Sequence, residues 1–169
     1  MRPDRFRPMG SAQGYPVIDS TDELAIRQIS ALPQEIQVLE AQARTEGFRF
    51  LTRLVEEWKN GYNRFNQPGE GLFGAFRNGQ LIGIGGLSYD PYAGAEIGRL
   101  RRVYIMPAAR GQHAGKALVQ HLLAYAALNF QVVRLSTDTP QGAEFYLRCG
   151  FQQVEDDTAT HVMSFVDAR

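Results

Sequence analysis

The sequence predicts a single domain of the α/β (α+β) class, and three observations support this fold class. Asn78-Gly79 separates two apolar runs, which is typical of a β-hairpin and therefore of antiparallel strands. A β-rich segment at 95–106 leads through a glycine-containing turn into apolar residues at helical spacing. Alternating strands and amphipathic helices flank these segments. The predicted order is a strand, two helices, three or four strands, a helix, a strand, a helix and two strands.

The N-terminal half is predicted to form a strand, two helices and the hairpin, because its apolar residues recur first at every second position and then at helical spacing. Gly47 separates the two helices, and Asn60-Gly61 ends the second one. A polar segment at 63–71, rich in Asn and Gly, is predicted to be a loop. The expected elements are a strand at 24–29, helices within 36–43 and 50–58, and hairpin strands within 72–89.

The C-terminal half is predicted to alternate strand and helix. Pro107 ends the long strand at 95–106, because proline cannot donate to a sheet ladder. The next helix begins near Gly111, and its apolar stripe runs from Leu118 to Ala126. Gly150 ends a later, shorter helix. The remaining expected elements are a strand at 132–137, a helix at 140–149 and strands at 151–155 and 160–166.

Composition indicates an ordinary soluble protein without an unusual partner. The 169 residues are 44% hydrophobic and 21% charged, which suits one globular core. We expect a flexible N-terminal tail over residues 1–20 and one domain over residues 21–169. Lys plus Arg and Asp plus Glu both number 18, so no overall field favours nucleic acid or a membrane, and we expect neither as a partner.

Targeting and metal-binding signals are missing from the sequence pattern. No apolar run approaches the roughly 18 to 20 residues of a transmembrane helix, and the Arg-rich start does not resemble a signal peptide. Cys149 is the only cysteine, which excludes an internal disulfide and a multi-cysteine zinc site. His113, His121 and His161 do not fall at metal-ligand spacing. We therefore expect a cytoplasmic protein without a metal.

The segment 109–118, ARGQHAGKAL, places two glycines and two cations at the start of a helix, where proteins often bind phosphates. A nucleotide P-loop needs four residues between its glycines and a hydroxyl after its lysine. Here Gly111 and Gly115 enclose three residues, and Ala117 follows Lys116. The spacing of a dinucleotide fingerprint is missing as well. A helix N-terminus with solvated cations is the alternative to a phosphate site.

The longer stretch LRRVYIMPAARGQHAGKAL resembles motif A of the GNAT superfamily of acyl-CoA-dependent N-acyltransferases. That motif is [Arg/Gln]-x-x-Gly-x-[Gly/Ala] after a strand ending near proline. Arg110 fills its first position, Gly115 its last, and His113 stands where the inner glycine is usual. If His113 adopts a positive φ, it bears a strain that glycine avoids. A second stretch, AEFYLRCGF at 143–151, is similar to the family's later signature, a Tyr-bearing helix that ends in Gly-Phe.

The resemblance covers about residues 22–166 and implies a GNAT-type fold: a mixed, mainly antiparallel sheet, splayed between its fourth and fifth strands and flanked by helices. It implies an N-acetyltransferase that moves acetyl from acetyl-CoA, its co-substrate, to a primary amine by direct attack in a ternary complex. The acceptor is then a small-molecule or peptide amine, and a homodimer remains open. The alternative is a non-catalytic acyl-CoA-binding or regulatory domain of the same fold.

The resemblance also assigns site residues. Tyr146 matches the family's general acid, and we favour Glu96, at the start of the long strand, as the base that accepts the amine proton; a solvated strand-end carboxylate is the alternative for Glu96. Thr139 stands roughly where many relatives carry a cofactor-contacting Asn. The expected cofactor-binding residues are the strand segment Val103, Tyr104 and Ile105, the turn residues Arg110, Gly111, Gln112, His113, Ala114, Gly115 and Lys116, and Thr139.

Other residues have two readings each. Arg99, Arg101 and Arg102 either bind the adenosine phosphate or an acidic substrate, or form a charged strand flank. The aromatic residues near the 63–71 loop either shape the acceptor pocket, as in the family, or belong to the core; they are Trp58, Tyr62 and Phe65. Cys149 is expected to serve packing rather than to form an acyl intermediate.

Overall fold

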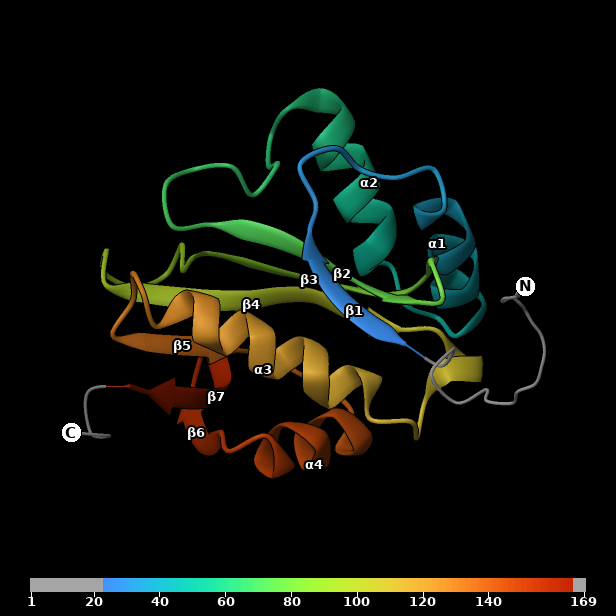
Figure 1. The fold of residues 1–169 in the computed structure, drawn as a ribbon. Coiled ribbons are helices and arrows are strands. Elements are labelled where there is room, and N and C mark those ends of the chain that lie inside the picture. Colours follow the sequence, from blue (N-terminus) through green and yellow to red (C-terminus); the bar gives the residue numbers. More distant parts are fainter. Residues whose placement is uncertain (1–22, 166–169) are drawn as a thin grey trace, which may run out of the picture.

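The computed structural model describes residues 23–165 as one seven-stranded sheet with helices on both faces (Figure 1). The tail expected at residues 1–20 lies outside the described residues. No helix within residues 23–165 is long and apolar enough to cross a membrane. The elements in chain order are β1 (Leu24–Gln28), α1 (Ile36–Thr45), α2 (Phe50–Asn60), β2 (Gly71–Arg77), β3 (Gln80–Tyr89), β4 (Ile97–Ile105), the 3-10 helix η2 (Pro107–Ala109), α3 (Ala114–Ala126), β5 (Val132–Leu135), α4 (Pro140–Arg148), β6 (Gln152–Asp156) and β7 (Ala159–Ser164).

The sheet has the strand order β1-β2-β3-β4-β5-β7-β6. Every neighbouring pair is antiparallel except β4 and β5, which run parallel. Three strands, not four, separate α2 from α3. The predicted fold class, a mixed and mainly antiparallel sheet flanked by helices, is confirmed.

Residues that tolerate a left-handed backbone set the chain reversals. Asn78 (φ 53°) and Gly79 (φ 83°) form the hairpin turn between β2 and β3, and positive φ at both positions is typical of a type I′ turn. Gly61 (φ 82°) ends α2, and Gly150 (φ 100°) follows α4. Each of these reversals lies where the sequence predicted it.

Helices cover both faces of the sheet, with α1 and α2 on one face and α3 and α4 on the other (Figure 1). The core is accordingly divided in two. One cluster joins the sheet to α1 and α2 and includes Leu39, Leu54 and Ile84. The other joins the sheet to α3 and includes Leu118 and Leu122.

The sheet opens between β4 and β5. Only the first three residues of β4, Ile97 to Arg99, pair with β5, whereas the strand continues to Ile105. The segment 100–105 therefore has no strand partner on its β5 side among the described residues. This opening is the splay between the fourth and fifth strands that the sequence resemblance implied.

Strand β4 also carries a bulge next to this opening. Ile84 of β3 pairs with Tyr104, but Gly86 pairs with Arg101, so β4 has one extra residue. Arg102 in the bulge has a φ of 61°, an uncommon conformation for a residue other than glycine. The guanidinium of Arg102 donates a hydrogen bond to Glu57 of α2 at 3.1 Å, which ties the bulge to the helix layer.

Candidate active site

The turn between β4 and α3 presents a continuous run of free backbone donors. The N–H groups from Gly111 to Lys116 have no hydrogen-bond acceptor among the described residues. The first helical hydrogen bond of α3 is donated by the Ala117 N–H to the His113 carbonyl at 3.0 Å. The N-terminal amides of a helix lack internal partners, and the helix dipole favours an anion there. This turn can therefore bind a phosphate group through its backbone.

His113 occupies the strained position of this turn. It precedes α3 with φ 66° and ψ 5°, in the left-handed region, and its side chain makes no capping hydrogen bond. Gly111, two residues earlier, also has a positive φ of 79°. His113 therefore has the positive φ considered in the sequence analysis, and it stands at a position whose backbone conformation favours glycine.

Arg110 points away from the turn and toward α1. Its two terminal nitrogens donate to the two carboxylate oxygens of Glu46 at 2.8 and 2.7 Å, and its Nε donates to the Ile105 carbonyl at 2.9 Å. Hydrogen bonds from Arg110 and Tyr104 hold the pKa of the Glu46 carboxyl below its usual range. Because both terminal nitrogens of Arg110 are bonded to Glu46, the guanidinium adds positive charge near the turn but has no free pair of donors for a ligand.

Tyr104 completes this cluster from the α1 side of the sheet. Its hydroxyl donates to Glu46 at 2.5 Å, and its ring lies 5.3 Å from the Arg110 guanidinium carbon. Burial, and then the Glu46 carboxylate, raise the pKa of Tyr104. Sequence reasoning missed Glu46, which lies just after α1 and 64 residues before Arg110; no local signal joins two positions so far apart.

The backbone of β4 alternates between β3 and the opening. The N–H of Met106 donates to Ile82 at 2.9 Å. Alternation in an antiparallel ladder then turns the backbone groups of Tyr104 toward β3 and the N–H of Ile105 toward the opening. Of the predicted strand contacts, Ile105 is therefore placed to meet a ligand through its backbone, whereas Tyr104 is not.

Tyr146 lies on α4, beyond the opening. Its ring packs edge-on against Phe145 and Phe151, with centroids 5.0 and 5.6 Å away, and its hydroxyl has no hydrogen-bond partner among the described residues. Burial raises the pKa of Tyr146, so the hydroxyl keeps its proton at neutral pH. A Cβ built on Gly115 would lie 3.3 Å from the ring of Phe145, which brings α4 against the glycine turn.

Two predicted residues occupy other surroundings. Thr139 caps α4, and its hydroxyl accepts the N–H of Gly142 at 3.0 Å. Glu96 is exposed and immediately precedes β4, at the end where β4 pairs with β5. Glu96 and Arg102 are six positions apart along the strand, a distance of about 20 Å. The structure therefore does not bring Glu96 to the splayed end of β4.

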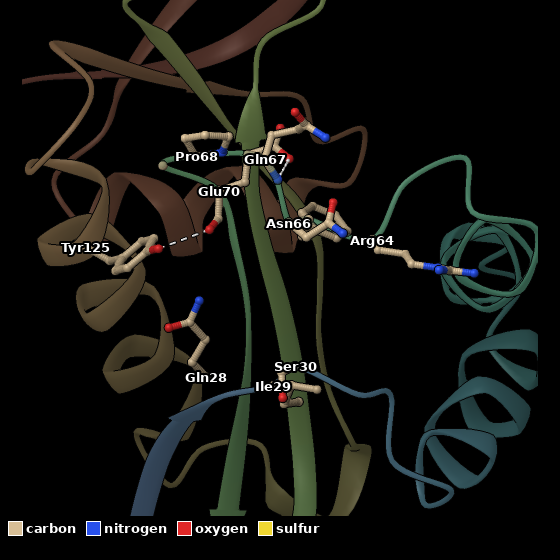
Figure 2. Close-up of a pocket in the computed structure, with 11 residues that line it drawn as sticks. Gln28, Ile29, Ser30, Arg64, Asn66, Gln67, Pro68, Glu70 and Tyr125 are labelled. Atoms are coloured by element: carbon tan, nitrogen blue, oxygen red, sulfur yellow. Dashed lines mark hydrogen bonds between the residues drawn. The ribbon is translucent and has the colours of Figure 1, made fainter.

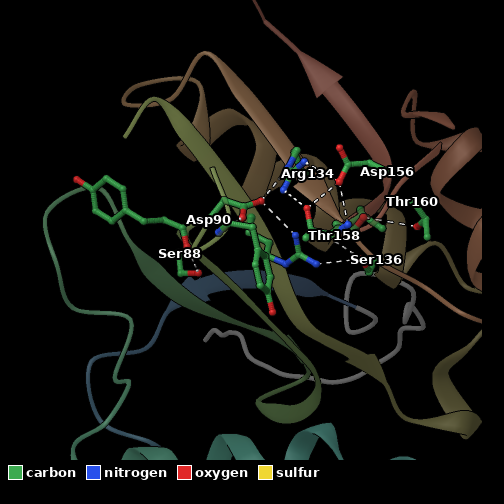
Figure 3. Close-up of polar contacts among 11 residues, drawn as sticks. Ser88, Asp90, Arg134, Ser136, Asp156, Thr158 and Thr160 are labelled. Carbon is green, nitrogen blue, oxygen red and sulfur yellow. Dashed lines mark hydrogen bonds and ion pairs between the residues drawn. The ribbon is translucent and has the colours of Figure 1, made fainter. Parts of the chain in front are cut away.

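A buried ion-pair network joins β4 and β5 at the end where these strands are paired, away from the opening (Figure 3). The Asp90 carboxylate, fully buried, accepts hydrogen bonds from Arg99 of β4 at 3.1 Å and Arg134 of β5 at 2.9 Å. Burial alone would raise the pKa of Asp90, but hydrogen bonds from Arg134 and the Tyr92 N–H keep it below its usual range. For Arg99, the structure supports the reading of a charged strand flank.

The loop between α2 and β2 lines two cavities. The larger, of about 560 Å³, lies between this loop, the end of β1 and Tyr125 of α3, whose hydroxyl donates to the Glu70 carbonyl at 3.0 Å (Figure 2). The smaller, of about 230 Å³, lies against the end of β3 and Arg101. Of the predicted acceptor-site aromatics, Phe65 and Trp58 pack in or against the core, and Tyr62, 82% exposed, lines the smaller cavity.

The remaining reactive residues are not grouped into a metal site. Within residues 23–165, no three or more His, Cys, Asp or Glu side chains lie close enough together to hold a metal ion. Cys149 is half-buried at the end of α4, and burial raises the pKa of its thiol, which makes a thiolate nucleophile unfavourable.

Comparison with known proteins gives one family and many similar folds. The sequence model of the acetyltransferase (GNAT) family matches residues 35–151. A solved structure from Exiguobacterium sp. 255-15, assigned as an acetyltransferase, is 27% identical, with a TM-score of 0.77 and coverage of 87% of this chain and 99% of its own.

Two further solved structures carry the cofactor. A GNAT family acetyltransferase from Brucella melitensis, in complex with acetyl-CoA, is 20% identical, with a TM-score of 0.61 over 85% of this chain and 89% of its own. A GNAT family N-acetyltransferase from Escherichia coli, in complex with CoA, is 18% identical, with a TM-score of 0.65 over 90% of this chain and 87% of its own. No curated protein matches the chain.

Proposed function

Because the chain belongs to the acetyltransferase (GNAT) family, we propose that it transfers the acetyl group of acetyl-CoA to a primary amine by direct attack within a ternary complex. The observation that carries this proposal is the run of free amides from Gly111 to Lys116 beside the unpaired edge of β4. The described residues 23–165 share one sheet, which supports a single N-acetyltransferase domain over residues 21–169.

In this proposal the pyrophosphate of acetyl-CoA binds the amides of the glycine turn. Lys116 adds positive charge from the first turn of α3, and the pantetheine arm runs along β4, where the Ile105 N–H faces the opening. Phe145 of α4 packs close to Gly115 and limits the space available to the pantetheine arm between α4 and the glycine turn. These contacts direct the thioester toward the bulge at Arg102.

The reaction needs a neutral amine, a site for the oxyanion and a proton for the leaving thiolate. An alkylamine with a pKa near 10.4 is only about one part in a few thousand neutral at pH 7, so its proton must be removed before attack. The amine nitrogen then bonds to the thioester carbon, and the oxyanion that forms accepts a hydrogen bond from the β4 backbone. When the C–S bond breaks, Tyr146 donates its proton to the CoA thiolate. The nitrogen of the new amide loses its surplus proton through water, and this proton restores the Tyr146 hydroxyl.

The route of the amine proton differs from the one expected from the sequence. Glu96 lies about 20 Å along β4 from the bulge. The carboxylates nearer the bulge, Glu57 and Glu46, are bonded to Arg102 and Arg110. We therefore assign the amine proton to solvent water and not to Glu96.

A second candidate, a non-catalytic acyl-CoA-binding domain of the same fold, is favoured by one observation. His113 holds a strained backbone at the position where the family motif has glycine. Strain there would weaken the turn without removing its amides.

The test combines cofactor binding with amine-dependent thiol release. We expect CoA and acetyl-CoA, but not ATP, to raise the melting temperature, and acetyl-CoA to release thiol when a suitable amine is present. Gly115→Asp should abolish CoA binding, because a carboxylate would stand against the pyrophosphate. Gly94→Asp is the matched control, because a Cβ at Gly94 meets no atom within 4 Å and adds the same charge on an exposed loop.

Two results would count against the proposal. If Gly115→Asp binds CoA as well as Gly94→Asp does, the phosphates lie elsewhere. If CoA binds but no amine on a broad panel releases thiol, the non-catalytic candidate gains support.

A further inference from the structure

Four arginines lie near one another on the α1/α2 side of β4 and β5, and three of them have a carboxylate partner. Arg99 and Arg134 share Asp90 (Figure 3), and Arg102 pairs with Glu57. Arg101 forms no hydrogen bond or ion pair with any described residue. A half-buried guanidinium that is bonded to no carboxylate can bind an anion from solution.

The direction of the Arg101 side chain follows from its neighbours in the sheet. Leu100 belongs to the core cluster on the α3 side, so Arg101, the next residue, faces the α1/α2 side. Arg101 pairs with Gly86, where a Cβ would lie 2.5 Å from the ring of Phe65. The Arg101 side chain therefore stands beside the α2–β2 loop.

Arg101 lines the smaller cavity, of about 230 Å³, which lies one residue from the bulge at Arg102. That volume is below the roughly 300 to 1,000 Å³ of a typical drug-sized pocket, so it suits a small acceptor or the end of a larger one. The other lining residues are Tyr62, Asn63, Gln67, Glu70, Ser88, Tyr89 and Pro91.

The cavity carries both signs of charge. Glu70 accepts hydrogen bonds from the backbone N–H groups of Gln67 at 3.2 Å and Tyr89 at 3.0 Å, which fix its carboxylate. Arg101 supplies the positive charge of the lining. Burial, and then the charge of Arg101, lower the pKa of the neighbouring Arg102, whose own partner is Glu57. A bare anion would be repelled by Glu70, and a bare amine by Arg101.

We propose that the acceptor carries a carboxylate as well as the reacting amine, and that Arg101 binds this carboxylate. The substrate class is then an amino acid or a similar amino-carboxylate. This inference rests on the proposed acetyltransfer, since it assigns the acceptor of that reaction. Arg101 is a specificity-determining residue in this arrangement, and the transfer of the acetyl group does not depend on it.

The test uses acceptors that differ only in the carboxylate: phenylalanine with phenethylamine, and ornithine with putrescine. We expect kcat/KM to be about 10- to 100-fold higher for the amino acid of at least one pair, as for a hydrogen bond to a charged group. Arg101→Gln should remove this preference by raising KM for the amino acid. The kcat/KM for the amine that lacks a carboxylate should stay unchanged, and so should the Kd of acetyl-CoA. Arg101→Lys should restore part of it, and Arg44→Gln, on the exposed surface of α1, is the matched control.

Equal kcat/KM within both pairs would overturn the inference. It would also be overturned if Arg101→Gln lowers kcat/KM equally for the two acceptors of a pair. O-phosphoethanolamine with ethanolamine tests the other anion. If the phosphate is preferred and the carboxylate is not, the assignment of an amino-carboxylate is wrong.

A separate measurement distinguishes failure of this inference from failure of the proposed function. If no amine releases thiol, the binding of N-acetylphenylalanine and of N-acetylphenethylamine can still be compared by calorimetry in the presence of CoA. Tighter binding of the carboxylate, lost in Arg101→Gln, would support the anion site even in a non-catalytic protein. Equal binding of the two would overturn it.

Discussion

Arg110, in the turn before α3, and Glu46, just after α1, form a two-point ion pair with nitrogen–oxygen distances of 2.8 and 2.7 Å. The pair joins the glycine turn to the helix layer on the other face of the sheet. Tyr104 of β4 donates to the same carboxylate, so three elements meet at Glu46. The conformation of the turn is therefore coupled to the position of α1.

The strength of this contact can be measured with Glu46→Gln, Arg110→Gln and the double variant. The Arg110 and Glu46 side chains are 45% and 29% exposed, so solvent screens their attraction. We expect a coupling free energy of about 1 kcal/mol from urea unfolding, near the upper end for exposed pairs, because the geometry is bidentate. Additive losses in the double variant would show that the pair does not contribute.

The same pair predicts a pH dependence. The pKa of Glu46 is lowered in the folded protein, so its contribution is present above the unfolded-state pKa of about 4.3 and is lost as the pH falls through the folded-state pKa. The difference in unfolding free energy between wild type and Glu46→Gln should therefore shrink from pH 7 to pH 3. Glu155→Gln, an exposed control, should show no comparable change. A difference that stays constant between the two pH values would contradict this.

Asp90→Asn should destabilise the fold more than any change in the glycine turn. The substitution leaves Arg99 and Arg134, whose side chains are only 12% and 14% exposed, without their shared counter-charge. Loss of one partner of a buried ion pair costs about 3 to 5 kcal/mol. Unfolding in urea measures this loss, with Asp157→Asn on the exposed β6–β7 turn as control. A loss as small as that of the control would mean that solvent already screens the two arginines.

Local sequence signals predicted most of the fold. Asn78-Gly79, Gly61 and Gly150 occupy backbone conformations that few other residues adopt easily, and each marks a reversal in the structure. The glycine turn was predictable from local sequence as well, because its donors are backbone N–H groups at the start of a helix. Apolar spacing then gave the order of strands and helices.

The parts of the site that were missed depend on contacts between distant segments. Glu46 meets Arg110 only because α1 packs beside the end of β4. Glu96 looked like a site residue because it precedes the long strand, but that end of β4 is the one that pairs with β5. The bulge gave no local signal either, since Arg102 is a non-glycine residue at a φ of 61°.

Two substitutions at His113 should separate backbone strain from side-chain chemistry. His113→Val places a β-branched residue at φ 66°, which should lower stability by about 1 to 2 kcal/mol and weaken CoA binding. His113→Gly should change stability by less than about 1 kcal/mol, because relief of strain offsets the larger entropy of the unfolded chain. Urea unfolding and calorimetry with CoA measure both effects.

The neighbouring residue Gln112 provides the control, because it is exposed and its φ is not positive. Gln112→Val should not reproduce the loss of stability. If Val and Gly at His113 behave alike, the left-handed backbone at this position is not a source of strain.

Tyr146→Phe is the most direct test of the proposed mechanism. Removing the hydroxyl should lower kcat by about 10- to 1000-fold, on the scale of a general acid. The hydroxyl has no hydrogen-bond partner among the described residues, so its removal should leave stability and the Kd of CoA nearly unchanged. Tyr125→Phe is the contrasting control, because it loses a 3.0 Å hydrogen bond to Glu70 and should reduce stability by about 1 kcal/mol without lowering kcat.

The pH profile of kcat adds a second readout for Tyr146. Burial raises the pKa of this hydroxyl above the usual value of about 10, so the proton donor stays protonated across the range in which the amine becomes neutral. We therefore expect kcat to rise toward alkaline pH without a falling limb below pH of about 10. A falling limb that vanishes in Tyr146→Phe would show an ordinary tyrosine pKa, and an unchanged kcat in that variant would remove Tyr146 from the mechanism.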